Sequence, residues 1–238
     1  MASKGKLKYK FPFGKSAKLG KGLLSFPLPL TTCQNRCVLS AKFTKGCYAV
    51  NNPQEKINKG RIERERSNLK LIRSDDFVRV CSKEIFDSNR KNLRWLDVGD
   101  LENFDQLKKI FQVCKITSDT NHGLFTQRDD LLFLMVQKNI KIPENLNIIL
   151  SHPEHLDLEI PEAEKEFFKN AGYDLTYEIN TTDPEKATCR GSTSGECGTC
   201  RDCYKKPQDQ DQKGEFIMLL HGKNSEKVAA KLKALQNV

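Results

Sequence analysis

Six short apolar segments alternate with helix-like segments along this chain, and this alternation restricts the fold more than any other sequence feature. Strands are expected at residues 23–30, 93–97, 123–126, 146–150, 173–179 and 215–220. Helices are expected at residues 53–73, 74–88, 102–116, 129–137, 161–171 and 225–235. Strands that alternate with helices form parallel sheets with right-handed crossovers. The sequence therefore predicts an α/β fold, in the first place a partial (β/α)6-type barrel of parallel strands, with a flat doubly wound sheet as the alternative.

The length of 238 residues suits one α/β domain with a full core. We expect a basic N-terminal arm at residues 1–21 and a single α/β domain at 22–238, with a cysteine-rich metal-binding insertion at 187–213 before the last strand. Mean hydropathy is -0.60, and the chain has no apolar run of about 18 residues, so no membrane span is expected. The start of the chain lacks the apolar core of a secretion signal, which favours a cytoplasmic protein.

The net charge of +9 is concentrated at the start of the chain, where residues 1–21 hold seven lysines and no acidic residue. These lysines are Lys4, Lys6, Lys8, Lys10, Lys15, Lys18 and Lys21. Tyr9, Phe11 and Phe13 lie between them and are candidates for stacking on bases. Phosphate backbones are the usual partner of such an arm, so nucleic acid or a nucleotide is the expected partner. The alternative is a solvated tail that aids solubility.

The nine cysteines fall mainly into two tight groups. In a reducing compartment such groups bind metal more often than they form disulfides. The first group is Cys33, Cys37 and Cys47, and the second is Cys189, Cys197, Cys200 and Cys203. Cys81 and Cys114 lie outside both groups among apolar neighbours, and we expect them to be buried as small hydrophobic residues.

The two groups differ in the metal site that they predict. Four thiolates at Cys189, Cys197, Cys200 and Cys203 complete a tetrahedral zinc site or hold an iron–sulfur cluster, and His221 is a candidate to replace Cys189 in a zinc site. The first group offers three sulfurs and leaves a coordination position open, as a catalytic centre requires. A zinc site completed by a distant histidine, or ordinary core cysteines, are the alternatives for the first group.

Polar residues follow several of the predicted strands, and parallel strands bring their carboxyl ends to one edge, where ligands bind. Asp97 and Asp100 come at the end of the second strand as candidate general bases or substrate-binding carboxylates, and Gly99 between them lets a ligand approach the backbone closely. Helix capping is the alternative role for Asp100. Arg128 and Ser151 follow the next two strands and, with Gly99 and Asp100, are the predicted cofactor-binding residues.

The order of several short motifs resembles the phage gene product 88 family over residues 18–222. These motifs are residues 18–22, Thr32-Cys33, Cys47-Tyr48-Ala49, residues 94–100, residues 143–146 leading to Ser151, Cys197-x2-Cys200-x2-Cys203-Tyr204 and His221. The resemblance implies a phage origin, and thus the host cytoplasm, but little about a reaction.

Two more distant resemblances imply enzymes. Radical S-adenosylmethionine enzymes are partial barrels with three cluster-binding cysteines after the first strand. Cys33, Cys37 and Cys47 would match those ligands and Gly99-Asp100 the methionine-amine contact, although nine residues separate Cys37 from Cys47 where that superfamily has two. Base-exchanging transglycosylases are barrels with catalytic aspartates and a zinc site of three cysteines and a histidine, which Cys197, Cys200, Cys203 and His221 resemble.

The sequence thus favours a phage-type iron–sulfur enzyme, similar to radical S-adenosylmethionine enzymes, that acts on nucleic acid or a nucleotide. The expected cofactors are a 4Fe–4S cluster and S-adenosylmethionine, with zinc as the alternative at the C-terminal cysteines. Asp97 and Asp100 are the predicted catalytic residues. A zinc-containing transglycosylase, and a non-catalytic zinc-stabilised nucleic-acid-binding protein, are the other two interpretations.

Overall fold

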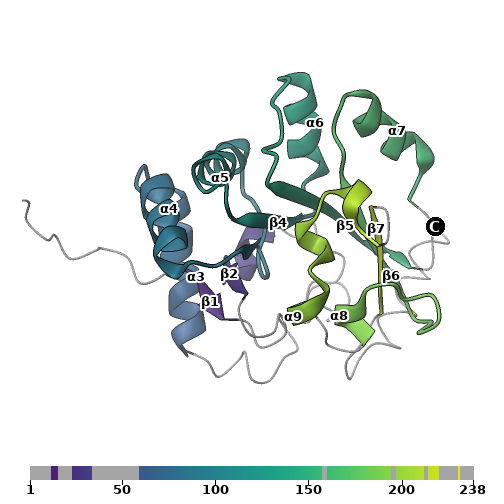
Figure 1. Ribbon diagram of the computed structural model, residues 1–238, viewed down its shortest axis with the longest axis horizontal. Coiled ribbons are helices and arrows are strands. Elements are labelled where there is room, and N and C mark those ends of the chain that lie inside the picture. The colour runs from purple at the N-terminus through teal and green to yellow at the C-terminus, as the bar shows by residue number, and fades with distance from the viewer. Residues whose placement is uncertain are drawn as a thin grey trace, which may run out of the picture.

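Seven strands form one sheet in the computed structural model, which describes residues 12–15, 23–33, 59–156, 160–193, 197–211, 214–219 and 230 (Figure 1). The strands are β1 (Gly14–Lys15), β2 (Leu24–Phe26), β3 (Asn92–Trp95), β4 (Asn121–Thr126), β5 (Leu146–Leu156), β6 (Thr176–Thr181) and β7 (Glu215–Leu219). They lie side by side in chain order. β1 is antiparallel to β2, and every later pair is parallel. The predicted α/β fold with a parallel sheet is confirmed.

Five helices of nine or more residues accompany the sheet in the described part of the chain. They are α3 (Lys59–Ile72), α4 (Phe77–Ser88), α5 (Phe104–Ile116), α6 (Asp129–Gln137) and α7 (Glu162–Asn170). Asn103 starts α5, because its side chain accepts a hydrogen bond from the amide of Gln106. The predicted helix at 225–235 falls outside the described residues, apart from residue 230.

The helices pack on the same face of the sheet. Alternate strand residues such as Phe26, Trp95, Leu124 and Ile148 share one apolar cluster with buried residues of α3 to α7, and Figure 1 shows α4 to α7 along one side of the strands. Strands in chain order with helices on one face are what right-handed crossovers in one direction produce. A doubly wound sheet places helices on both faces, whereas the five long helices in the described residues share one face.

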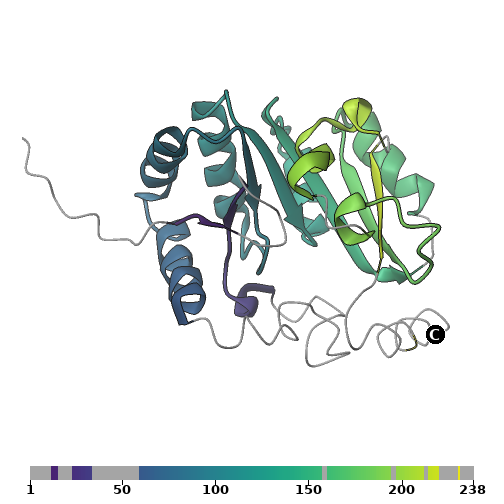
Figure 2. The same ribbon diagram turned by 60° about the horizontal axis from the view of Figure 1, so that its bottom comes forward.

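The opposite face of the sheet is covered by the segment between β6 and β7. It contains the short helices α8 (Arg190–Thr193) and α9 (Cys197–Cys200) and the 3-10 helix η3 (Asp202–Tyr204). η3 contacts β4 and β5, and the light-green to yellow segment lies across the strands in Figure 2. We call this side the inner face.

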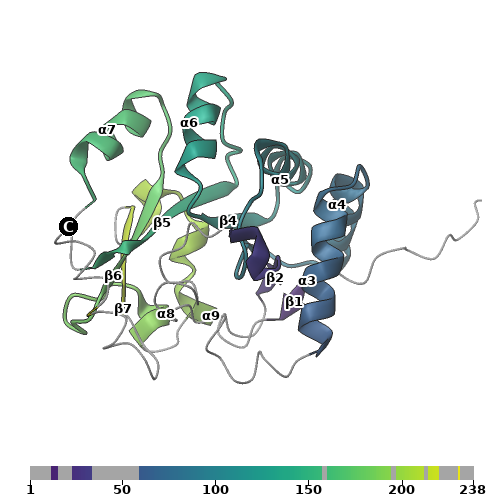
Figure 3. The ribbon, with the colours of Figure 1, turned by 180° about the vertical axis from the view of Figure 1, so that it is seen from behind.

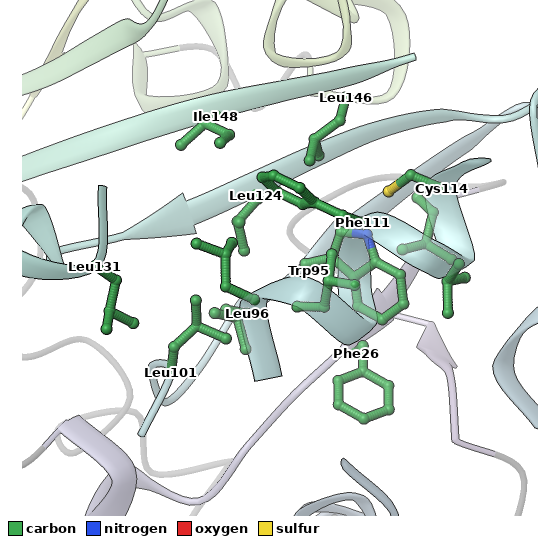
Figure 4. Packing of buried hydrophobic residues seen from close by; sticks show 14 of the residues in the cluster. Phe26, Trp95, Leu96, Leu101, Phe111, Cys114, Leu124, Leu131, Leu146 and Ile148 are labelled. Atoms are coloured by element: carbon green, nitrogen blue, oxygen red, sulfur yellow. The ribbon is translucent and has the colours of Figure 1, made fainter. Parts of the chain in front are cut away.

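Trp95 is the centre of the apolar cluster (Figure 4). Its ring centroid lies 5.4 Å from that of Phe26, and 6.0 Å from those of both Phe13 and Phe77. Phe13 is 1% exposed, so the prediction that it stacks on bases is wrong. It precedes β1 and anchors the start of the sheet.

Several strands differ from the prediction. β2 ends at Phe26 where residue 30 was expected, and β6 covers Thr176–Thr181 where 173–179 was expected. β1 was not expected, because its two residues lie within a lysine-rich segment and carry no apolar alternation. β5 continues to Leu156 through Ser151 and His152, whereas the proline at position 153 predicted that the strand ends near Leu150. The pairing of β5 with β6 is irregular between Ser151 and Leu156, which fits a proline in a parallel strand.

His122 is buried in the core in its neutral form. This burial leads to a prediction of how the stability of the fold depends on pH. Trp95 Nε1 donates to His122 Nδ1 at 3.2 Å, and the other ring nitrogen lies 3.0 Å from Thr117 Oγ1. Burial lowers the pKa of His122 from 6.5 to about 4. Since the folded pKa lies below the unfolded one, the unfolded chain binds the proton first as pH falls. Stability from this residue is complete above about pH 6.5 and about 3 kcal/mol is lost toward pH 4.

Urea unfolding at about pH 7 and about pH 5 measures this effect. The wild type should lose stability between the two values, and His122→Gln should lose about 2 kcal/mol less over the same interval. An equal change in His122→Gln and the wild type would contradict the assignment.

Candidate metal and strand-end sites

The carboxyl ends of β2 and β3 are joined tightly, and the first cysteine group begins there. After β2 the chain runs through Leu28 into the 3-10 helix η2 (Leu30–Cys33). The Leu28 amide donates to the Val98 carbonyl at 2.8 Å, and the Asp100 amide donates to Thr32 Oγ1 at 2.9 Å. Cys33 therefore leaves the sheet directly beside the Gly99-Asp100 turn.

Asp100 is buried at this edge, and its carboxylate accepts several hydrogen bonds. Its Oδ1 accepts from the Leu101 amide at 2.7 Å and from Thr126 Oγ1 at 2.6 Å, and its Oδ2 accepts from the Gln127 amide at 2.8 Å. Burial raises the pKa of Asp100, against these hydrogen bonds and nearby Arg128, which lower it. Both carboxylate oxygens are thus used to connect the ends of β3 and β4. This geometry favours a positioning role over direct contact with a substrate.

Arg128 is also committed to local contacts. Its guanidinium binds both carboxylate oxygens of Asp130 at 2.7 and 2.8 Å and donates to the Leu101 carbonyl. The residue is 6% exposed. Its predicted role in cofactor binding stays a prediction, and in this arrangement it clamps the turn after β4 against the turn after β3.

Asp97 is the more accessible of the two predicted catalytic carboxylates. It is half-buried at the end of β3, whereas Asp100 is buried. Leu96 before it has a left-handed φ of 60°, a conformation that costs a branched residue about 1 kcal/mol or more. Its amide donates to the Phe26 carbonyl at 3.0 Å, which holds this turn. The backbone is therefore forced to turn where Asp97 meets the strand edge.

The second cysteine group is fixed to the sheet at both of its ends. The Cys189 amide donates to the Ile217 carbonyl of β7 at 3.0 Å, and Asn147 Nδ2 of β5 donates to the Cys203 carbonyl at 3.1 Å. A Cβ on Gly123 would lie 2.9 Å from that same carbonyl, so β4 needs glycine there. Lys206 Nζ donates to the Leu146 carbonyl at 2.9 Å. The segment is built onto the inner face.

The four thiols of this group influence one another electrostatically. Burial is the main cause that raises the pKa of each of them, Cys189, Cys197, Cys200 and Cys203. Cys189 raises the pKa of both Cys200 and Cys203, and Cys197 raises that of Cys189 and Cys203. Residues up to fourteen positions apart in sequence are thus close together in space. Without a metal ion these thiols are protonated at neutral pH.

The thiols are near one another but are not arranged as ligands. Among the residues that the structure describes, no group of three His, Cys, Asp or Glu side chains is positioned to hold a metal ion. The donor set itself fits zinc or an iron–sulfur cluster, which take four thiolates. Binding therefore requires the cysteine side chains to converge from the positions they have here.

Two charged residues on the inner face were not identified from the sequence. Arg94 of β3 stacks on Phe125, with its guanidinium carbon 3.7 Å from the ring centroid, and it lowers the pKa of Cys197 and Cys203. Burial raises the pKa of Glu178 of β6, which accepts from Ser151 Oγ at 3.0 Å. The sequence feature that could have indicated Arg94 is its place between two apolar residues, Leu93 and Trp95. Strand side chains alternate between faces, so a charge there lies on the face opposite to the core.

Several predicted site residues lie outside the described part of the chain: Cys37, Cys47, His221, Lys6, Lys8, Lys10, Lys18 and Lys21. Lys15 belongs to β1, but its side chain is not described. Ser151 donates to Glu178, as noted, which places it on the inner face. His152 points to the other side, where its Nε2 lies 2.9 Å from Glu164 of α7. The structure thus brings Cys33, Gly99, Asp100 and Arg128 together at one edge and the second cysteine group onto the inner face.

Comparison with known proteins gives one family and no further relatives. A family model described as gene product 88 matches residues 3–206. No curated protein and no solved structure matches the chain. Within the described residues, no helix has the length and apolar character to cross a membrane.

Gly99 predicts how rigid the strand-end turn must be. Its φ is +75°, and an added Cβ would lie 2.6 Å from the Leu28 carbonyl oxygen and 2.7 Å from Thr32 Oγ1. Gly172 is the matched control, because its φ is +81° and an added Cβ would meet nothing within 4 Å. Gly172→Ala should cost about 1 kcal/mol from backbone strain alone, and Gly99→Ala about 3 kcal/mol or more. Urea unfolding measures the stability of both variants. Equal losses of unfolding free energy would show that the residues around Gly99 move to accommodate the added methyl group.

Proposed function

The chain belongs to the gene product 88 family of phage proteins, and we propose that it is an iron–sulfur enzyme that acts on nucleic acid or a nucleotide. The observation that carries this proposal is the gathering of Cys189, Cys197, Cys200 and Cys203 on the inner face of the sheet, where electrostatic interactions connect the four thiols. Four thiols are the donor set that zinc or an iron–sulfur cluster takes, which supports a shared ligand.

The surroundings of the second group suit an anionic cluster. Four thiolates around zinc or around a 4Fe–4S cluster carry a net negative charge, and Arg94 supplies a positive charge from the strand beneath. Phe125 stacks against that guanidinium, which holds the charge away from solvent. We assign this group a second cluster or a structural zinc.

The reactive centre in this proposal is the first cysteine group. Cys33 leaves the sheet beside Gly99 and Asp100, at the carboxyl edge where parallel sheets bind ligands. Cys33, Cys37 and Cys47 would hold a 4Fe–4S cluster with one open iron position, which is where S-adenosylmethionine would bind. Asp97 would act as the general base, while Asp100 would position the turn. Ser151 and Arg128 would complete the walls of the cofactor site.

A partial barrel is the architecture that we propose for the sheet. Strands in chain order with helices on one face have the order of a barrel that is opened between its first and last strands. In such a sheet the inner face encloses the site, and here the cysteine-rich segment occupies it. The lysine-rich arm would supply contacts to nucleic-acid phosphates.

Metal and sulfide content provides the first test. Protein purified without oxygen should contain iron and acid-labile sulfide, with broad absorption near about 400 nm. Cys197→Ser/Cys200→Ser should lose the metal of the second group only. Cys81→Ala is the matched control, since Cys81 is fully buried in the apolar cluster and should leave the metal content unchanged. Zinc in a colourless protein would contradict the iron–sulfur proposal and favour the transglycosylase or the non-catalytic binding protein.

Mass spectrometry of nucleosides tests the reaction. DNA and RNA from cells that express the wild type should contain a nucleoside that is absent from cells expressing Cys33→Ala or Asp97→Asn. Asp97→Asn should leave the free energy of unfolding within about 1 kcal/mol of the wild type. Asp100→Asn should cost about 2 kcal/mol or more, because one carboxylate oxygen that accepts a hydrogen bond becomes a donor. If cells that express Asp97→Asn still contain the new nucleoside, the catalytic role of Asp97 is contradicted.

A further inference from the structure

α3 presents a line of cations to solvent on the side opposite to its packed face. Its buried residues, Asn68, Leu71 and Ile72, contact the body of the protein. Lys59, Arg66 and Lys70 are exposed and lie seven and four positions apart, which places them on one line along a helix of 3.6 residues per turn. We call these three residues the α3 ridge.

The ridge has few acidic neighbours. Glu65 is turned away from it and pairs with Arg61 at 2.8 Å, whereas the exposed Glu63 lies on the same line of the helix, one turn from Lys59 and one turn from Arg66. Among the described residues, Lys59, Arg66 and Lys70 form no ion pair with an acidic side chain. Arg73, one turn further on, shares its charge with Glu102 of α5. With respect to the described residues, the three side chains therefore remain available to an external anion, next to the carboxylate of Glu63.

The lysine-rich start of the chain joins the protein at the same helix. Asn68 Nδ2 of α3 donates to the Pro12 carbonyl at 2.9 Å and to the Pro27 carbonyl at 2.9 Å. An added Cβ on Gly14 would lie 2.9 Å from the Arg64 guanidinium, so β1 runs directly against α3. Figure 3 shows α3 beside β1, at the end of the sheet away from α7. The two strongly basic parts of the sequence are therefore anchored at one place.

We propose that the α3 ridge binds the sugar–phosphate backbone of duplex DNA. A rise of 1.5 Å per residue separates Lys59 from Arg66 by about 10 Å and Arg66 from Lys70 by about 6 Å. The ridge thus spans about 16 Å, the length of roughly five steps of one DNA strand. The ridge itself contains no aromatic side chain to stack on unpaired bases, which favours a duplex over a single strand. This inference rests on the nucleic-acid part of the proposed function.

Fluorescence anisotropy with a labelled duplex of about 20 base pairs tests the ridge. Arg66→Gln/Lys70→Gln should weaken binding about tenfold or more at low salt. It should also reduce the slope of log K against log salt by about 1.8, because two phosphate contacts are lost. Lys138→Gln/Lys169→Gln is the matched control: it removes the same charge from exposed positions at the ends of α6 and α7, far along the sheet (Figure 1). The control should change affinity less than about twofold.

Three results would overturn the proposal. Equal losses in both double variants would show that net charge alone drives binding. If a single strand of the same sequence binds more tightly than the duplex, and the ridge substitutions weaken that binding, the surface binds unpaired nucleic acid instead. If the wild type does not bind duplex DNA, both the proposed role of the ridge and the nucleic-acid part of the proposed function are contradicted. Iron and sulfide measured on the same preparation would still decide the iron–sulfur part separately.

Discussion

The whole structure depends on the difference between the two faces of the sheet. Leucine, isoleucine and aromatic side chains on one face pack against helices α3 to α7, and Trp95 is completely buried among them. Because the crossovers run in one direction, no long helix in the described residues covers the other face. That face carries Arg94, Asn147 and Glu178, which need polar partners when they are buried. The cysteine-rich segment supplies the cover and, at the Cys203 carbonyl, the partner of Asn147, while Ser151 of β5 donates to Glu178.

Much of this fold follows from sequence patterns. Short apolar segments gave β3, β4 and β7 within about two residues, and the periodic apolar positions gave α5 and α6. The limits of β1 and β5 did not follow, because tertiary pairing determines them. β1 forms since Phe13 is buried against Trp95, and β5 extends because β6 offers a partner beyond Ser151. Neither cause is visible in the local sequence.

The candidate sites were predictable in part. Residue type and spacing identified the cysteines and the Asp97–Asp100 turn, but not which carboxylate is held by the turn after β4. That distinction comes from hydrogen bonds to residues 26 and 27 positions away, Thr126 and Gln127. The sequence does not indicate Arg94 and Glu178 as site residues. A single charge within an apolar strand cannot be interpreted until the face that it occupies is known. Their approach to the thiols depends on the register of four strands.

β3 connects the two cysteine groups physically. Arg94 in its middle lies near the thiols of the second group, and three residues later Asp97 opens the turn that holds the start of the first group. Leu93 and Trp95 on either side of Arg94 are completely buried, so the strand cannot slide or rotate without loss of the core. A shift of β3 would move the charge at one site and the Gly99-Asp100 turn at the other together. The apolar cluster therefore fixes the relative position of both groups.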